Sequence, residues 1–187
     1  MTEQVTAICR ACYYELRQLC SVVHSLTREA AKTLVHAFIS CCLDNCNALL
    51  YGIVYNQFQR LQSVQNAVAR SVTGSRCSEH ITPVLRSLHW LPVRQRIAFK
   101  LATLVHKCLN GHVPTYLADF YRQTGDRRSG MRSAETWILH MPRARSTYCD
   151  RSFAVAGPSI WNLPPAIRDP SLSRQGFRRL LKTHLFG

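Results

Sequence analysis

The stretch that decides the fold is HITPVLRSLHWLPVRQRIAFKLATLVHKCLNGHVP, which runs from residue 80 to residue 114. It predicts a short helix, a tight corner and a long helix. Thr82 can cap the short helix, and Pro83 suits the first helical position, where its missing N–H costs nothing. Pro92 breaks the chain at the corner, and the long helix then runs from Val93 to Asn110.

The long helix is amphipathic. Its apolar residues form two adjacent rows at helical spacing, Ile97, Leu101, Leu104 and Cys108 beside Ala98, Ala102, Val105 and Leu109. A stripe of this width predicts burial against a core. Gly111 can take the left-handed conformation that ends a helix, and Pro114 prevents the helix from resuming. The opposite side carries Arg96, Lys100 and Lys107, with Arg94 near the start of the helix.

The segments before this stretch also have helical periodicity. The first segment repeats its apolar residues every three or four positions, at Val5, Ile8, Cys9, Cys12, Leu16, Leu19 and Val23, with Tyr13 and Tyr14 widening that face. Thr27 and Asn56 can cap two further helices. The inner faces of these two helices are predicted to hold Ala31, Leu34, Val35, Phe38, Ile39 and Cys42 in one, and Leu61, Val64, Val68 and Val72 in the other, which ends at Gly74.

The segments after Pro114 are shorter. Residues 116–121 predict one or two helical turns, and 136–141 predict a short extended piece. Within 152–167 the pairs Gly157-Pro158 and Pro164-Pro165 are expected to keep the helices short. A last helix is predicted from Ser173 to Phe186, and its apolar side holds Phe177, Leu180, Leu181 and Leu185.

Strand signals are nearly absent, so the predicted class is all-α, an irregular helical bundle with a basic loop region in its C-terminal half. Three regions are expected. They are a helical bundle over residues 1–121, an Arg-rich connector over 122–151 without clear periodicity, and short C-terminal helices over 152–187.

The charge of the chain indicates a polyanionic partner. Among 187 residues, 24 are Lys or Arg and 10 are Asp or Glu, a formal net charge of +14, and 20 of the 24 cations are Arg. Residues 1–93 carry +3 and residues 94–187 carry +11. Such a basic half is typical of nucleic-acid binding and, less often, of binding to an anionic membrane, while the plain alternative is a soluble basic protein.

Two rows of cations share helix faces with few acidic neighbours, and no Asp or Glu occurs between Arg86 and Tyr116. Like charges one helical turn apart repel, so a polyanion would relieve this repulsion. No motif that reads bases is visible, so contacts are expected to go to phosphates and to weaken with salt. The candidate binding residues are Arg94, Arg96, Lys100, Lys107, Arg127, Arg128, Arg143, Arg145, Arg174, Arg178 and Lys182.

Catalytic and metal sites are not predicted. The carboxylates form no closely spaced pair for a two-metal site, and neither a phosphate-binding glycine loop nor a nucleophile elbow occurs. Cys9 and Cys12 fall on a buried row, which favours packing over zinc, and adjacent Cys41 and Cys42 point to different sides of a helix. Asp44 is interpreted as a helix cap, and His89-Trp90 as core or corner packing.

Cysteine usage and hydropathy bear on location. The nine cysteines are read as reduced thiols, and neither a signal peptide nor a membrane-spanning run is seen. We therefore expect an intracellular chain, nuclear or cytoplasmic and not secreted, with no membrane partner and no cofactor.

Several motifs resemble those of one protein family, both in their amino-acid sequences and in their order along the chain. LDNCNALLYG (residues 43–52), LQSVQNAVAR (61–70) and HITPVLRSLHWLPVR (80–94) are similar to the segment after the palm of a non-LTR retrotransposon (LINE, jockey-like) reverse transcriptase. Shorter matches follow in the same order over nearly the whole chain: FK (99–100), KCLNG (107–111), PTYL (114–117), RSF (151–153), AGP (156–158), WN (161–162), FRR (177–179) and KTHLF (182–186).

The resemblance implies a thumb-like helical segment of an RNA-directed DNA polymerase that contacts an RNA template, a DNA primer or their hybrid. The family's catalytic aspartates and endonuclease have no counterpart in this sequence, so the chain is expected to be non-catalytic, with the upstream palm as a partner in the intact polyprotein. The alternatives are a helical scaffold or interaction fragment without a nucleic-acid role, and a truncated or decayed retroelement copy without activity of its own.

Overall fold

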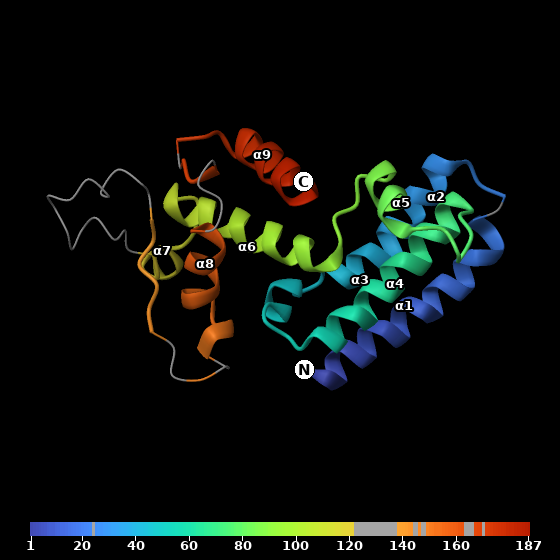
Figure 1. The fold of residues 1–187 in the computed structure, drawn as a ribbon, viewed down its shortest axis with the longest axis horizontal. Coiled ribbons are helices and arrows are strands. Elements are labelled where there is room, and N and C mark those ends of the chain that lie inside the picture. Colours follow the sequence, from blue (N-terminus) through green and yellow to red (C-terminus); the bar gives the residue numbers. More distant parts are fainter. Residues whose placement is uncertain (24, 122–137, 144–145, 147–148, 163–166, 170) are drawn as a thin grey trace, which may run out of the picture. The chain divides into compact units, whose positions relative to one another are not determined.

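The computed structural model of the chain is all-α, as the sequence predicts (Figure 1). It describes residues 1–23, 25–121, 138–143, 146, 149–162, 167–169 and 171–187. The α-helices are α1 (Thr2–Val23), α2 (Arg28–Val35), α3 (Cys41–Asp44), α4 (Tyr55–Thr73), α5 (Ile81–Ser87), α6 (Val93–Leu109), α7 (Thr115–Ala118), α8 (Phe153–Trp161) and α9 (Arg174–Phe186). A π-helical stretch covers His36–Ser40, and 3-10 turns cover Asn47–Leu50 and Cys149–Arg151.

The chain folds as two compact units, Met1–Arg96 and Ile97–Gly187. The boundary therefore lies inside α6, whereas the sequence pattern places the first boundary near residue 121. The helical pattern of α6 is uninterrupted in the sequence, so the pattern does not indicate where the packing partners of the helix change. Each unit is described by itself below.

In the first unit, α1 packs along α4 (Figure 1). The predicted inner row of α1 is confirmed, with Val5, Cys9, Cys12, Leu16, Leu19 and Val23 buried. The prediction that Tyr13 and Tyr14 widen this buried face is wrong, because both rings are exposed. At 100° per residue these positions fall beyond the edge of the stripe that meets α4.

The helices that follow α1 begin and end largely where the sequence indicates. The Thr27 side chain accepts a hydrogen bond from the backbone N–H of Ala30, which confirms it as the N-cap of α2. Phe38, expected inside, is exposed, because the π-helical stretch changes the phase of the apolar residues around it. Helix α4 starts at Tyr55, so Asn56 is not its cap, and it ends as predicted at Gly74 with φ of +71°.

The corner between α5 and α6 is held to α4 by amide side chains. The buried Gln65 donates a hydrogen bond to the carbonyl of Leu91 at 2.8 Å, and Gln62 accepts one from the backbone N–H of Val93 at 2.9 Å. His89 takes a left-handed φ of +57° and is exposed, so it turns the chain at the corner without being buried there. Helix α5 begins at Ile81, one residue before the predicted cap.

The second unit is built on the remainder of α6, whose inner residues Ile97, Leu101, Val105 and Cys108 are buried as predicted. Gly111 follows with φ of +69°. Helix α8 is short, but it runs through Gly157-Pro158 without ending there, which the sequence analysis did not expect. Ser173 caps α9, where Phe177 and Leu181 are buried and Leu180 is exposed, contrary to prediction.

Part of the predicted connector 122–151 docks on α8. The Asn162 side chain accepts a hydrogen bond from the backbone N–H of Leu139 at 3.0 Å and donates one to its carbonyl at 2.9 Å. Leu139 itself is buried. A single asparagine therefore fixes the described part of the expected extended piece, and residues 136–137 of that piece lie outside the described residues.

Candidate nucleic-acid interface

Two of the predicted cations, Arg94 and Arg96, lie in the first unit and differ in their surroundings. Arg94 is exposed. Arg96 is half-buried, and its guanidinium donates a hydrogen bond to the Asp44 carboxylate in an ion pair. Asp44 also accepts a hydrogen bond from the Asn47 side chain at 3.1 Å. Asp44 is therefore the partner of a cation 52 residues away, and its interpretation as a helix cap is wrong.

In the second unit, α6 and α9 pack through aromatic rings. His106 of α6 stacks on Phe177 of α9 with ring centroids 4.3 Å apart, and Trp161 of α8 stacks on the same Phe177 at 5.7 Å. The Nε2 atom of His106 lies 3.1 Å from the carbonyl oxygen of Leu172. Because a carbonyl can only accept, Nε2 carries the proton in this contact. This cluster fixes how α9 lies on α6.

The burial of His106 has an electrostatic consequence. Desolvation disfavours the imidazolium and lowers the pKa of His106, the hydrogen bond to Leu172 raises it, and nearby His112 adds a smaller lowering. The neutral ring is therefore the form that stacks on Phe177. The charge of this region is carried instead by Lys and Arg side chains around the ring.

The packing of α9 on α6 brings cations of both helices together. Lys107 and Arg174 line one pocket of about 190 Å³, with His106, Asn110, His112 and Ser171–Ser173 as its other walls. One turn further along α9, the guanidinium of Arg178 lies over the Phe99 ring, 5.7 Å from the centroid. Within the described part of the chain, Lys107, Arg174 and Arg178 form no ion pair.

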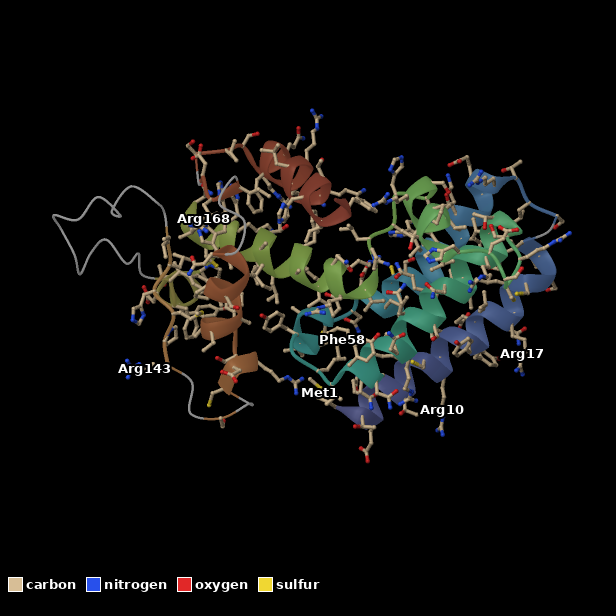
Figure 2. The ribbon with its side chains drawn as sticks, viewed as in Figure 1. Met1, Arg10, Arg17, Phe58, Arg143 and Arg168 are labelled. Carbon is tan, nitrogen blue, oxygen red and sulfur yellow. The ribbon has the colours of Figure 1, made fainter. Side chains whose placement is uncertain are left out.

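The remaining predicted cations are less closely grouped. Lys100 is exposed on α6, Arg143 is exposed after Leu139 (Figure 2), and the Lys182 ammonium lies 5.8 Å from the Phe186 ring centroid. Arg127, Arg128 and Arg145 lie outside the described residues. The structure therefore brings Lys107, Arg174 and Arg178 together on two packed helices.

The Asp169 carboxylate lies five residues before Arg174 in the sequence. It accepts hydrogen bonds from the backbone N–H and the hydroxyl of Ser171, which lower the pKa of Asp169. The carboxylate is thus engaged by its own turn. Arg174 and Arg178 lie one helical turn, about 6 Å, apart along α9. Cations at such spacing can follow consecutive phosphates of a polynucleotide strand.

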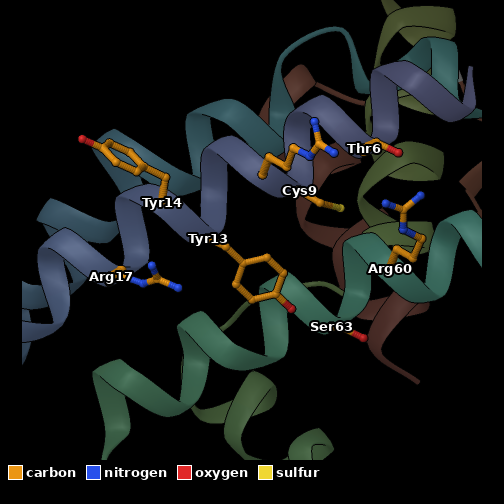
Figure 3. Close-up of a pocket in the computed structure, with 8 residues that line it drawn as sticks. Thr6, Cys9, Tyr13, Tyr14, Arg17, Arg60 and Ser63 are labelled. Carbon is orange, nitrogen blue, oxygen red and sulfur yellow. The ribbon is translucent and has the colours of Figure 1, made fainter.

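A second basic site was missed by the sequence analysis. Arg10 and Arg17 of α1 and Arg60 of α4 line a shallow groove of about 570 Å³, together with Tyr13 and Tyr14 (Figure 3). Arg10 and Arg17 are seven residues apart on α1, and Arg60 belongs to α4. The three arginines therefore form no cluster in the sequence. The available signal was the heptad spacing of Arg10 and Arg17, which places both on one face of α1.

The cysteines behave as packing residues at three positions. Burial raises the pKa of Cys12 to about 12 and that of Cys108 to about 11, and Cys9 is raised in the same direction. These thiols therefore stay protonated near neutral pH, when they are poor nucleophiles and poor metal ligands. Among the described residues, no group of three or more His, Cys, Asp or Glu side chains is arranged to hold a metal ion.

Across the described ranges, none of the helices combines the length and the apolar character needed to cross a bilayer. Comparison with known proteins gives no family assignment, since no family model, no curated protein and no solved structure matches the chain.

Proposed function

We propose that the chain binds nucleic acid through phosphate contacts made by α6 and α9, as a non-catalytic segment of a LINE-type reverse transcriptase holding an RNA–DNA hybrid. The observation that carries this proposal is the grouping of Lys107, Arg174 and Arg178. The stack of His106 on Phe177 joins their two helices, so the helix positions that carry the cations are set before a ligand arrives.

Preorganisation is what separates this group from an ordinary solvated helix face. Cations on a single exposed helix usually contribute only solubility, and their long side chains lose entropy when they bind. In this unit two helices present cations around one pocket, and Arg178 is oriented by the Phe99 ring. We choose an RNA–DNA hybrid over other polyanions because the order of motifs in the sequence resembles that of a LINE-type reverse transcriptase.

The test is a salt titration of hybrid binding with two charge-matched double variants. Lys107→Gln/Arg174→Gln removes two cations from the α6–α9 group. Arg28→Gln/Arg76→Gln removes two exposed cations of the first unit and serves as the control. Each phosphate contact contributes about −0.9 to the slope of log K against log salt, so the first variant should flatten the slope by roughly 2.

The control variant should leave the slope unchanged, and far-UV circular dichroism should confirm the helix content of both proteins. Equal losses of affinity in the two variants would mean that only bulk charge matters, and the assignment to α6 and α9 would then be wrong.

A second candidate function, a helical scaffold that binds another protein, is favoured by one specific observation. Leu49 of the 3-10 turn, together with Val54 and Tyr55 at the start of α4, is largely exposed, and the three lie within seven residues of sequence. Exposed large apolar side chains that are close in sequence can form part of a surface for protein contacts. Self-association in size-exclusion chromatography, together with no retention on heparin at moderate salt, would favour this function over the first.

A further inference from the structure

The groove between α1 and α4 has the features of a binding site that is separate from the α6–α9 cations. Along α1 the lining residues Thr6, Arg10, Tyr13 and Arg17 follow one another at three- and four-residue spacing, so they form one continuous stripe. Arg60 and Ser63 of α4 form the facing wall. All of these residues belong to the first unit.

The charged side chains that line the groove are all cationic. No Asp or Glu lines it. The nearest carboxylate on that face of α1 belongs to Glu3, seven residues or about 10 Å before Arg10. Arg10 and Arg17 make no hydrogen bond or ion pair with any described residue, and Figure 2 shows both side chains extending outward from α1. An anionic ligand would therefore meet guanidinium groups that no carboxylate occupies.

The aromatic groups of the groove are its second distinctive feature. Tyr13 is 45% exposed and Tyr14 is 64% exposed, although large rings are usually covered. In Figure 3 the Tyr13 ring reaches from α1 toward Ser63 of α4 and lies between Arg17 and Arg60, whereas Tyr14 points away from α4. Tyr13 thus offers a ring inside the groove, with cations on both sides of it.

We propose that this groove binds a short single-stranded segment of nucleic acid, with a base stacked on Tyr13 and phosphates paired with Arg10, Arg17 and Arg60. A positively charged groove with aromatic rings is the arrangement that binds single strands without reading sequence. Arg10 and Arg17 are about 10 Å apart along α1, which corresponds to roughly three nucleotide steps of a stacked strand.

The chemistry of the groove selects a single strand over a duplex. The bases of a duplex are stacked on one another, so a ring at the protein surface cannot reach their faces. The phosphates of a duplex would still attract the arginines, but Tyr13 would contribute nothing. The proposal rests on this groove alone and does not require that α6 and α9 bind a hybrid.

The experiment uses the full chain and a fluorescein-labelled twelve-nucleotide oligo(dT), with fluorescence anisotropy as the readout. Tyr13→Ala should weaken binding about 10-fold, in keeping with the loss of one stacked base. Tyr13→Phe keeps the ring face and should bind within about twofold of the original chain, in keeping with a stacking role for that face. Arg10→Gln/Arg17→Gln should weaken binding and flatten the salt slope by about 1.4.

Arg28→Gln is the control for charge, because Arg28 is exposed at the start of α2 and does not line the groove. It should leave the affinity nearly unchanged. The Lys107→Gln/Arg174→Gln variant separates the two proposals, since it should bind oligo(dT) normally while losing affinity for the hybrid. Far-UV circular dichroism of each variant verifies that α1 remains folded.

Three results would overturn the proposal. One is equal affinity of Tyr13→Ala and the original chain for oligo(dT), which would remove the stacking. Another is equal competition by a blunt duplex or by inorganic pyrophosphate, which would reduce the groove to an anion site. The third is displacement of oligo(dT) by poly-glutamate at the same charge concentration, which would point to an acidic protein as the occupant.

Discussion

The ion pair between Arg96 and Asp44 gives the sharpest prediction about stability. The side chain of Arg96 is 18% exposed and that of Asp44 is 36% exposed, so the pair is neither fully solvated nor buried. Exposed pairs contribute about 0.2–1 kcal/mol, whereas removal of one partner from a buried pair costs about 3–5 kcal/mol. We therefore expect a coupling free energy of about 1–2 kcal/mol between the two residues.

The coupling is measured with a double-mutant cycle of Arg96→Met, Asp44→Asn and the double variant, by urea unfolding followed by far-UV circular dichroism. Arg94→Gln is the matched control, because Arg94 is two residues earlier on α6 and exposed. It should change the free energy of unfolding by less than about 0.5 kcal/mol. A coupling near zero, or an equal loss in Arg94→Gln, would refute a structural role for the pair.

The same variants bear on function. A guanidinium engaged by a carboxylate has less capacity to meet a phosphate. Arg96→Met should therefore reduce hybrid affinity less than Arg94→Gln does. Both proteins are compared without urea, at a temperature where each is fully folded. A larger loss of hybrid affinity in Arg96→Met than in Arg94→Gln would contradict this prediction and indicate that Arg96 contacts the hybrid.

Three further predictions concern buried contacts. Gln65→Ala orphans the carbonyl of Leu91 and should lower the free energy of unfolding by about 1–3 kcal/mol in urea titrations, and an unchanged midpoint would contradict this. Gly157→Ala places a Cβ 2.7 Å from the Tyr121 ring, so it should cost about 1–3 kcal/mol and lower Tm, and an unchanged Tm would exclude the clash. Burial lowers the pKa of His106, so the unfolded state takes up its proton first and stability should fall as pH drops below the ordinary histidine range. His106→Phe should reduce that pH dependence of Tm, and an identical dependence in both proteins would rule the ring out.

The sequence predicted those features of the fold that depend on local periodicity. The inner row of α1, the glycines Gly74 and Gly111 that follow α4 and α6, and the cap Thr27 all follow from spacing and backbone chemistry within a few residues. The all-α class follows from the same periodicity, because apolar residues recur with the helical period of about 3.6 residues rather than with the strand period of about 2 residues.

The features that the sequence missed depend on contacts between distant residues. The partner of Arg96 is 52 residues away, so the periodicity of α6 assigned it to an outer cation row. Gly157 of α8 permits close approach of Tyr121, which lies after the end of α7, a role that no local pattern reveals. The groove of Arg10, Arg17 and Arg60 exists only because α1 lies along α4.

The central claim is that the cations of α6 and α9 meet a polynucleotide, and lysine acetylation measures it directly. The chain has four lysines, of which Lys100, Lys107 and Lys182 lie on α6 and α9, while Lys32 lies on α2 and pairs with Glu29 at 2.9 Å. The chain is acetylated briefly with and without a saturating RNA–DNA hybrid, and each site is quantified by mass spectrometry. We predict that the hybrid protects Lys107 most clearly, protects Lys100 and Lys182 as well, and leaves Lys32 unchanged. Equal modification of Lys107 with and without the hybrid, under conditions where the hybrid is bound, would contradict the account.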